Sequence, residues 1–280
     1  MQFAPATQPE SNWDVIKRGW NLYNASFSHV FILALSLSVV AFLPRLVSFA
    51  LGTNIVIALP PYSPHRLWFT LIDIVCLIFF TCIMWRIRCF VLGKHERITE
   101  DFNVAFHKWP LILVASIIQT LLYFILLITI TSYFSYLAQT GILFKTNPVS
   151  ICMVILPAAV QLLFNVYVFF LLLFYLPLIV TENSTIIGSL KRSAELVWRN
   201  WWRVFYVQTF PWFCYVLVII LIKVVTHFPI HLYFFQVNKA TLSGLYTHLF
   251  IFGMFIPWWA TSLIVQLHDL ELRKTADKII

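Results

Sequence analysis

Charged residues are scarce in this 280-residue chain. They make up 11% of it, whereas hydrophobic residues make up 61%. An average soluble domain has about 25% charged and roughly 45–50% apolar residues. A soluble fold cannot hide so much apolar surface, so the composition excludes a soluble globular protein. It predicts an all-α, polytopic membrane protein built as a helical bundle.

Catalytic signatures are also missing. No GxSxG, HExxH, GxxxxGK or Rossmann glycine pattern occurs, and the seven glycines are scattered. The polar segments are too short to form a separate catalytic domain. We therefore expect a protein that is not an enzyme and needs no cofactor. An intramembrane enzyme stays open as a second alternative, although no two candidate catalytic groups share an apolar run.

The sequence also gives little support for a metal site or for disulfide bonds. His227 and His231 are four residues apart, which would place two imidazoles on one helical face, but Pro229 lies between them. We therefore predict no metal site. No CxxC pair occurs, and the number of cysteines is odd. We predict that they are unbridged apolar residues: Cys76, Cys82, Cys89, Cys152 and Cys214.

Six apolar runs are present, and each is long enough to cross a bilayer with about 20 residues. The first contains Pro44 and Arg45 late in its length, where we expect a bend. We predict a single six-span domain over residues 11–268, between a polar tail at 1–10 and a cytoplasmic tail at 269–280. The runs cover approximately 30–51, 67–85, 111 into the 130s, 151–176, 204–226 and 248–265.

An amphipathic helix is predicted between the fourth and fifth runs. The apolar run ends at Pro177, and a capping stretch with Glu182 and Ser184 marks the helix start. Cations lie on the polar side, where Glu195 precedes Arg199 by four residues in the favourable order for an ion pair. Such a helix suits the lipid headgroup layer. Its apolar face repeats at spacings of 3 and 4, through Ile187, Leu190, Ala194, Val197 and Trp201.

Two further segments share this design. One begins at Ser11 and sets aromatic residues opposite Lys17 and Arg18, and the other runs from Thr99 until Pro110 cuts it short. We predict parallel repeats at about 11–98, 99–183 and 184–268, each an interfacial helix followed by two spans. The simpler alternative is that any basic segment before a span has this pattern.

Six spans place the two termini and every second connection on the same side of the membrane. Most of the 19 Lys and Arg residues fall in these segments. The positive-inside rule therefore places the N- and C-termini and the amphipathic connections in the cytoplasm. Because the net charge of +8 is distributed in this way, we expect no nucleic-acid partner.

Polar residues within the runs are candidates for function. Asp73 is ionisable in a span, but a structural ion pair with Arg45 at similar depth is the leading explanation for it. Gln161 and Asn165 suit either a polar path or hydrogen bonds between helices. A transporter would bring Asp73, Gln161 and Asn165 together in one cavity.

A motif within the stretch from Pro177 to Trp202 consists of Pro177, Ile179, Val180, Glu182, Ser189, Leu190, Arg192, Ser193, Leu196 and Trp198. This stretch resembles YciC-like bacterial inner-membrane proteins and the membrane domain attached to some glycerophosphoryl diester phosphodiesterases. The resemblance implies six spans in an inner membrane, with this stretch joining the fourth and fifth. The YciC-like family has no established activity, and this chain has no attached phosphodiesterase domain. It is also richer in aromatics and poorer in glycine.

These patterns favour a non-catalytic inner-membrane protein that serves envelope or lipid homeostasis. Its predicted partners are anionic lipid headgroups or another membrane protein, since each cation near an anionic surface contributes about 1 kcal/mol. A permease for a small molecule is the first alternative. The predicted contact face consists of Lys17, Arg18, Lys191, Arg192 and Arg199.

Overall fold

The structure, a computed structural model, describes residues 6–50, 64–94, 97–139, 148–182, 184–227 and 242–276. All regular structure in these ranges is helical. Six stretches in them are long and apolar enough to cross a membrane, which confirms the all-α six-span prediction. All five cysteines are unbridged, as predicted. The helices are α1 (Asn12–Ala50), α2 (Pro64–Val91), α3 (Ile98–Gln139), α4 (Pro148–Leu172), α5 (Tyr175–Glu182), α6 (Ile186–Trp198), α7 (Trp201–Thr226) and α8 (Leu242–Ala276).

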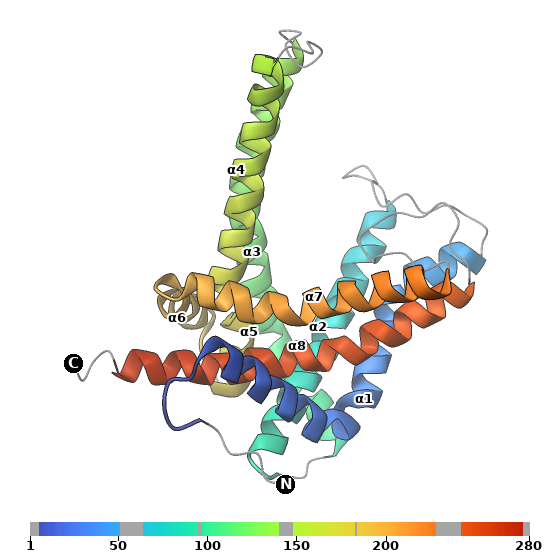
Figure 1. Ribbon diagram of the computed structural model, residues 1–280, viewed down its shortest axis with the longest axis vertical. Helices are drawn as coiled ribbons and strands as arrows, with labels where there is room; N and C mark the ends of the chain where they lie inside the picture. The colour runs from blue at the N-terminus through green and yellow to red at the C-terminus, as the bar shows by residue number, and fades with distance from the viewer. Residues whose placement is uncertain are drawn as a thin grey trace.

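The core is built around α1 and α8, which pack against each other in opposite directions (Figure 1). Glycine residues allow this close approach at two positions along the helix pair. A Cβ atom placed on Gly253 would lie 2.9 Å from Ser38 Oγ, and one placed on Gly19 would lie 3.1 Å from Ser262 Oγ. Small residues at a helix interface allow this close backbone contact in a membrane, where van der Waals packing drives helix association.

The remaining spans surround this pair. α7 lies beside α8, and α2 packs against α1, α3, α5 and α8. α3 and α4 form a hairpin whose far end extends away from the other helices (Figure 1). This hairpin joins the rest of the bundle through α2, α5, α6 and α7.

Three helices continue past points at which the sequence suggested a change of segment. The first interfacial helix and the first span are one helix, α1, and α3 continues through Pro110. A proline inside a helix removes one backbone hydrogen bond and favours a kink, but tertiary packing can hold both halves together. The tail predicted from residue 269 belongs to α8 as far as Ala276, and its Asp269 is buried. The sequence repeats stay a prediction.

Candidate functional site: α6 and the charged end of the bundle

The fourth span is a broken helix. α4 ends at Leu172 and α5 begins at Tyr175. Pro177 has no N–H to donate to the carbonyl oxygen of Leu173, one turn earlier, so the helical ladder is interrupted there. At the break, the Leu173 N–H donates to the carbonyl of Phe170 at 3.3 Å, which is a tighter turn than an α-helix makes.

Ser193 of α6 fills this break. The Phe174 N–H donates to Ser193 Oγ at 3.1 Å, and the Ser193 hydroxyl donates to the Leu171 carbonyl at 2.9 Å. Ser193 is completely buried. One side chain thus satisfies a backbone donor and a backbone acceptor that the broken helix leaves open, which ties the position of α6 to the geometry of the fourth span.

We expect Ser193→Ala to destabilise the protein by about 1–3 kcal/mol, because it leaves a buried N–H and a buried carbonyl without their hydrogen-bond partner. Hydrogen exchange at residues 171–175 and thermal unfolding in detergent would measure the effect. Ser189→Ala is the matched control, since Ser189 is equally buried but its hydroxyl bonds the Ile186 carbonyl within α6, at 2.8 Å. Equal effects of the two substitutions would show that Ser193 does not hold the break.

The predicted helix-start residues have other roles. Thr185 is the N-cap of α6 and accepts the Gly188 N–H at 3.3 Å. Ser184 instead donates to the Leu178 carbonyl in α5 at 3.0 Å, and Glu182 is the last residue of α5. Pro177 is buried in the first turn of α5. The assignment of Glu182 and Ser184 to the start of α6 was therefore wrong by a few residues.

The buried face of α6 is not the same as the apolar face that the spacing identifies. The side that packs inward is centred on Ser189, Ser193, Leu196 and Val197. Ile187, which belongs to the predicted apolar face, is 76% exposed, and Trp198 is 66% exposed. Ser193 faces inward, where its hydroxyl reaches the break in the fourth span, whereas Ile187 and Trp198 point outward.

Charged residues on α6 divide into paired and exposed groups. Arg192 bridges two carboxylates, with Glu182 Oε2 at 2.5 Å and Glu271 of α8 on its other side. Glu195 pairs with Lys274 Nζ at 2.7 Å, so the predicted pair with Arg199 was wrong. The hydrogen bond from Lys274 lowers the pKa of Glu195 below its ordinary value.

Lys191 and Arg199 are exposed, and neither joins an ion pair with another described residue. Trp202 follows Arg199 closely in sequence, lies in the first turn of α7 and is also exposed. We call the set formed by Ile187, Lys191, Trp198, Arg199 and Trp202 the α6 headgroup face. It combines cations with large exposed apolar side chains, as a helix at the membrane interface does.

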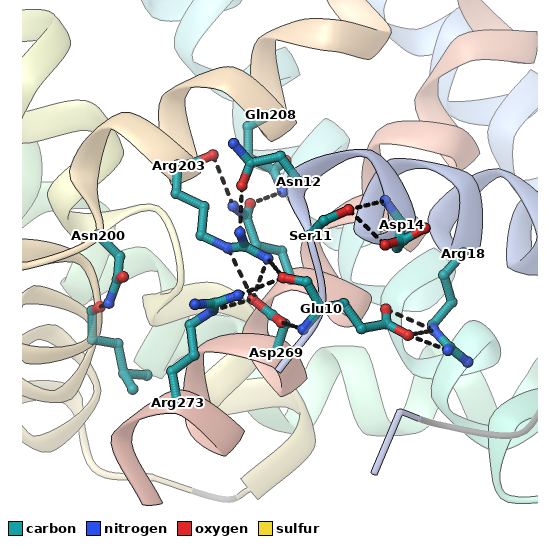
Figure 2. Close-up of polar contacts among 12 residues, drawn as sticks. Glu10, Ser11, Asn12, Asp14, Arg18, Asn200, Arg203, Gln208, Asp269 and Arg273 are labelled. Carbon is teal, nitrogen blue, oxygen red and sulfur yellow. Dashed lines mark hydrogen bonds and ion pairs between the residues drawn. The ribbon is translucent and has the colours of Figure 1, made fainter. Parts of the chain in front are cut away.

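A buried carboxylate organises the same end of the bundle (Figure 2). Asp269 accepts the Glu10 N–H at 2.9 Å, Arg203 Nε at 3.0 Å and Arg273 Nε at 3.1 Å. Arg203 also donates to the Glu10 carbonyl at 2.6 Å. Arg18, predicted to face lipid, binds the Glu10 carboxylate through Nε at 2.9 Å, whereas Lys17 is exposed. The cluster fastens the beginning of α1 to α7 and α8.

A second polar cluster lies where α2, α3 and α5 meet. Arg86 Nε donates to the buried Asp101 carboxylate at 2.6 Å. The buried Lys108 donates to the Val180 carbonyl at 2.6 Å and Arg88 donates to the same oxygen at 3.3 Å. These cations sit at the C-terminal end of α5, where the helix dipole favours positive charge.

Sequence reasoning missed the carboxylates at the centre of these clusters. The sequence places Asp269 in a predicted charged tail and Asp101 in the first turn of a predicted amphipathic helix. The available signal was a carboxylate close to an apolar run, together with arginines at the ends of other runs. This signal does not say which arginine the fold brings to which carboxylate.

The predicted intramembrane residues do not all come together. Asp73 is exposed on α2, and the recorded ion pairs among described residues do not join it to Arg45, whose guanidinium lies over the Phe42 ring. Gln161 Nε2 donates to Asn165 Oδ1 at 2.9 Å within α4. The cavity expected of a transporter is therefore not formed by Asp73, Gln161 and Asn165.

Within the described ranges, no group of three or more His, Cys, Asp and Glu side chains is placed to hold a metal ion. His231 lies outside those ranges. The chain matches no protein-family model, no curated protein and no solved structure. The resemblance to YciC-like proteins stays a prediction.

Proposed function

We propose that this integral membrane protein engages anionic lipid headgroups through the α6 headgroup face and has no catalytic activity. The observation that carries the proposal is the exposure of Lys191 and Arg199 beside Ile187 and Trp198. Apolar side chains of this size enter the acyl boundary, while cations one turn away meet phosphates. Each cation contributes about 1 kcal/mol near an anionic surface.

The five predicted contact residues do not contribute equally to this proposal. Arg192 and Arg18 are held by carboxylates, so their charges are largely compensated within the protein. Lys17 lies on the exposed side of α1 with Trp13, which is also exposed, and adds a second contact of the same kind. Lipid contact therefore centres on Lys191 and Arg199, with Lys17 in support.

The biological role that fits this contact is lipid or envelope homeostasis in a bacterial inner membrane. The positive-inside bias supports cytoplasmic termini. The described N-terminal residues also lie against α8, since the Ala6 carbonyl lies 2.9 Å from His268 Nε2. Because Ser193 joins α6 to the break in the fourth span, lipid contact on α6 is placed to influence that span.

The test is lipid retention measured by native mass spectrometry after exchange into vesicles of phosphatidylglycerol and phosphatidylcholine. Lys191→Gln/Arg199→Gln should weaken retention of phosphatidylglycerol by roughly 25-fold, the equivalent of about 2 kcal/mol. Retention of phosphatidylcholine should not change. Lys94→Gln/Arg97→Gln is the matched control, because it removes two exposed cations from the connection between α2 and α3.

Two results would contradict the proposal. The first is equal phosphatidylglycerol retention by the wild type and Lys191→Gln/Arg199→Gln. The second is an equal loss in the control variant, which would mean that any exposed cation contributes and that α6 is not a specific contact.

A further inference from the structure

Four aromatic side chains form a continuous row where α1, α7 and α8 pack against one another. Trp13 of α1 contacts Phe210 of α7, with ring centroids 5.8 Å apart, and Phe210 contacts Trp258 of α8 at 5.9 Å. Trp258 in turn contacts Trp20, again on α1, at 4.7 Å. The row therefore leaves α1 at Trp13 and returns to α1 at Trp20.

Lys17 closes this row into a ring. Trp13, Lys17 and Trp20 are four and three residues apart, which places them within about 60° of one another around the helix. All three are exposed, Trp13 at 59% and Trp20 at 42%. None of the ion pairs within the described ranges includes Lys17. We call the set formed by Trp13, Lys17, Trp20, Phe210 and Trp258 the α1 aromatic site.

Trp258 contributes an unused hydrogen-bond donor to this site. Its side chain is only 6% exposed, and its buried indole N–H donates to no other described residue. A buried tryptophan usually finds an acceptor for this N–H, because an unpaired buried donor is unfavourable. Trp20 and Phe210, the two rings of the site that contact Trp258, are themselves incompletely buried and have room to turn outward. The site therefore favours a ligand that brings an acceptor oxygen to the Trp258 N–H.

These groups match the part of a glycerophospholipid where the headgroup joins the acyl chains. That part carries a phosphate, which suits Lys17, and ester carbonyls, which accept hydrogen bonds. Tryptophan is enriched at this level of a membrane. The predicted sixth span ends near residue 265, seven residues after Trp258, so Trp258 lies about 10 Å along the helix from that end. A quaternary ammonium group, which aromatic rings also attract, is disfavoured by the charge of Lys17.

We propose that the α1 aromatic site binds one glycerophospholipid, with the phosphate at Lys17 and an ester carbonyl accepting the Trp258 N–H. The inference rests on the proposed function for the class of ligand only, and the site is distinct from the α6 headgroup face. Aromatic side chains that merely anchor a helix at the interface need only apolar area. A bound lipid is distinguished from such anchoring by recognition of its ester carbonyl.

The test compares two phosphatidylglycerols with the same headgroup, one with ester-linked and one with ether-linked chains. Both are added in equal amounts to the full-length protein in detergent, and native mass spectrometry separates the two complexes by mass. Only the ester lipid offers a carbonyl, so the wild type should retain about fivefold more of it, the effect of one hydrogen bond. This preference should disappear in Trp258→Phe, which keeps an aromatic ring but removes the N–H.

Two further variants separate the contributions. Lys17→Gln should lower the retention of both lipids by about fivefold and leave their ratio unchanged, because the phosphate is common to both. Lys191→Gln/Arg199→Gln should keep the ester preference. Failure of the proposed function therefore appears in the total phosphatidylglycerol retained by this double variant, whereas failure of the present proposal appears in the ratio of the two lipids.

Equal retention of the ester and ether lipids by the wild type would overturn the proposal and leave these side chains as interfacial anchors only. An ester preference that persists in Trp258→Phe would also overturn it, by placing the carbonyl contact elsewhere. If Trp258→Phe does not fold, Trp20→Leu takes its place, since it removes an exposed wall of the site. A preference that survives Trp20→Leu would then overturn the proposal in the same way.

Discussion

Replacing Asp269 with asparagine is expected to lower the free energy of unfolding by about 3–5 kcal/mol, the usual cost of removing one partner from a buried ion pair. Asp269 is 1% exposed and is shared by Arg203, Arg273 and the Glu10 N–H. Asparagine keeps the volume but removes the negative charge. Its single amide oxygen can accept either from the guanidinium groups or from the Glu10 N–H, so the other side of this contact meets an NH2 donor and loses its acceptor.

Thermal unfolding in detergent would measure this effect, and we expect the midpoint to fall by about 6 °C or more. Hydrogen exchange should increase at residues 6–12, because Asp269 and its arginines fasten them to α7 and α8. Asp14→Asn is the control, since Asp14 is an exposed carboxylate in the first turn of α1. If both variants lost the same stability, Asp269 would not be the centre of this contact.

Replacing Gly253 with leucine is expected to separate α1 from α8 and to cost about 1–3 kcal/mol or more through overpacking. A Cβ atom at this position already meets Ser38 Oγ at 2.9 Å and the Ala34 carbonyl oxygen at 3.6 Å. A leucine side chain has no space between the two backbones. Since α1 and α8 share the core of the bundle, their separation should loosen the whole membrane domain.

A double-mutant cycle identifies the cause. Gly253→Ala should destabilise the protein because its methyl group meets Ser38 Oγ, and Ser38→Ala should recover most of that loss. Ser38→Ala alone should cost little, since the Ser38 hydroxyl bonds only the Ala34 carbonyl of its own helix, at 2.9 Å. Tyr246→Leu, on the exposed side of α8, is the control. Additive effects of the two alanine substitutions would contradict contact at Ser38.

Several features of the fold were predictable from local sequence. The helix start at Ser11 is one: Ser11 Oγ accepts the Asp14 N–H at 3.2 Å and donates to its carboxylate at 2.5 Å. This cap needs only residues three apart in sequence. The six spans were equally predictable from the sequence, because length and apolar composition decide whether a helix can cross a bilayer.

The inward face of α6 was not predictable in the same way. In a soluble protein the apolar face of a helix is the buried face, but beside a membrane the lipid side is apolar as well. The spacing from Ile187 to Val197 therefore identified a helix without identifying which side the protein covers. Ser193 decided that orientation, because it satisfies the break produced by Pro177 in a different helix.

The sequence by itself determined an all-helical membrane protein with six spans, unbridged cysteines and a basic helix between the fourth and fifth spans. The tertiary structure decided which charges are compensated. Glu195 pairs with Lys274, 79 residues away, and Asp269 with Glu10, 259 residues away. Local spacing cannot reveal such partners, because they depend on which helix ends the packing of α1, α6, α7 and α8 brings together. That packing leaves Lys191 and Arg199 exposed and makes them the residues to test.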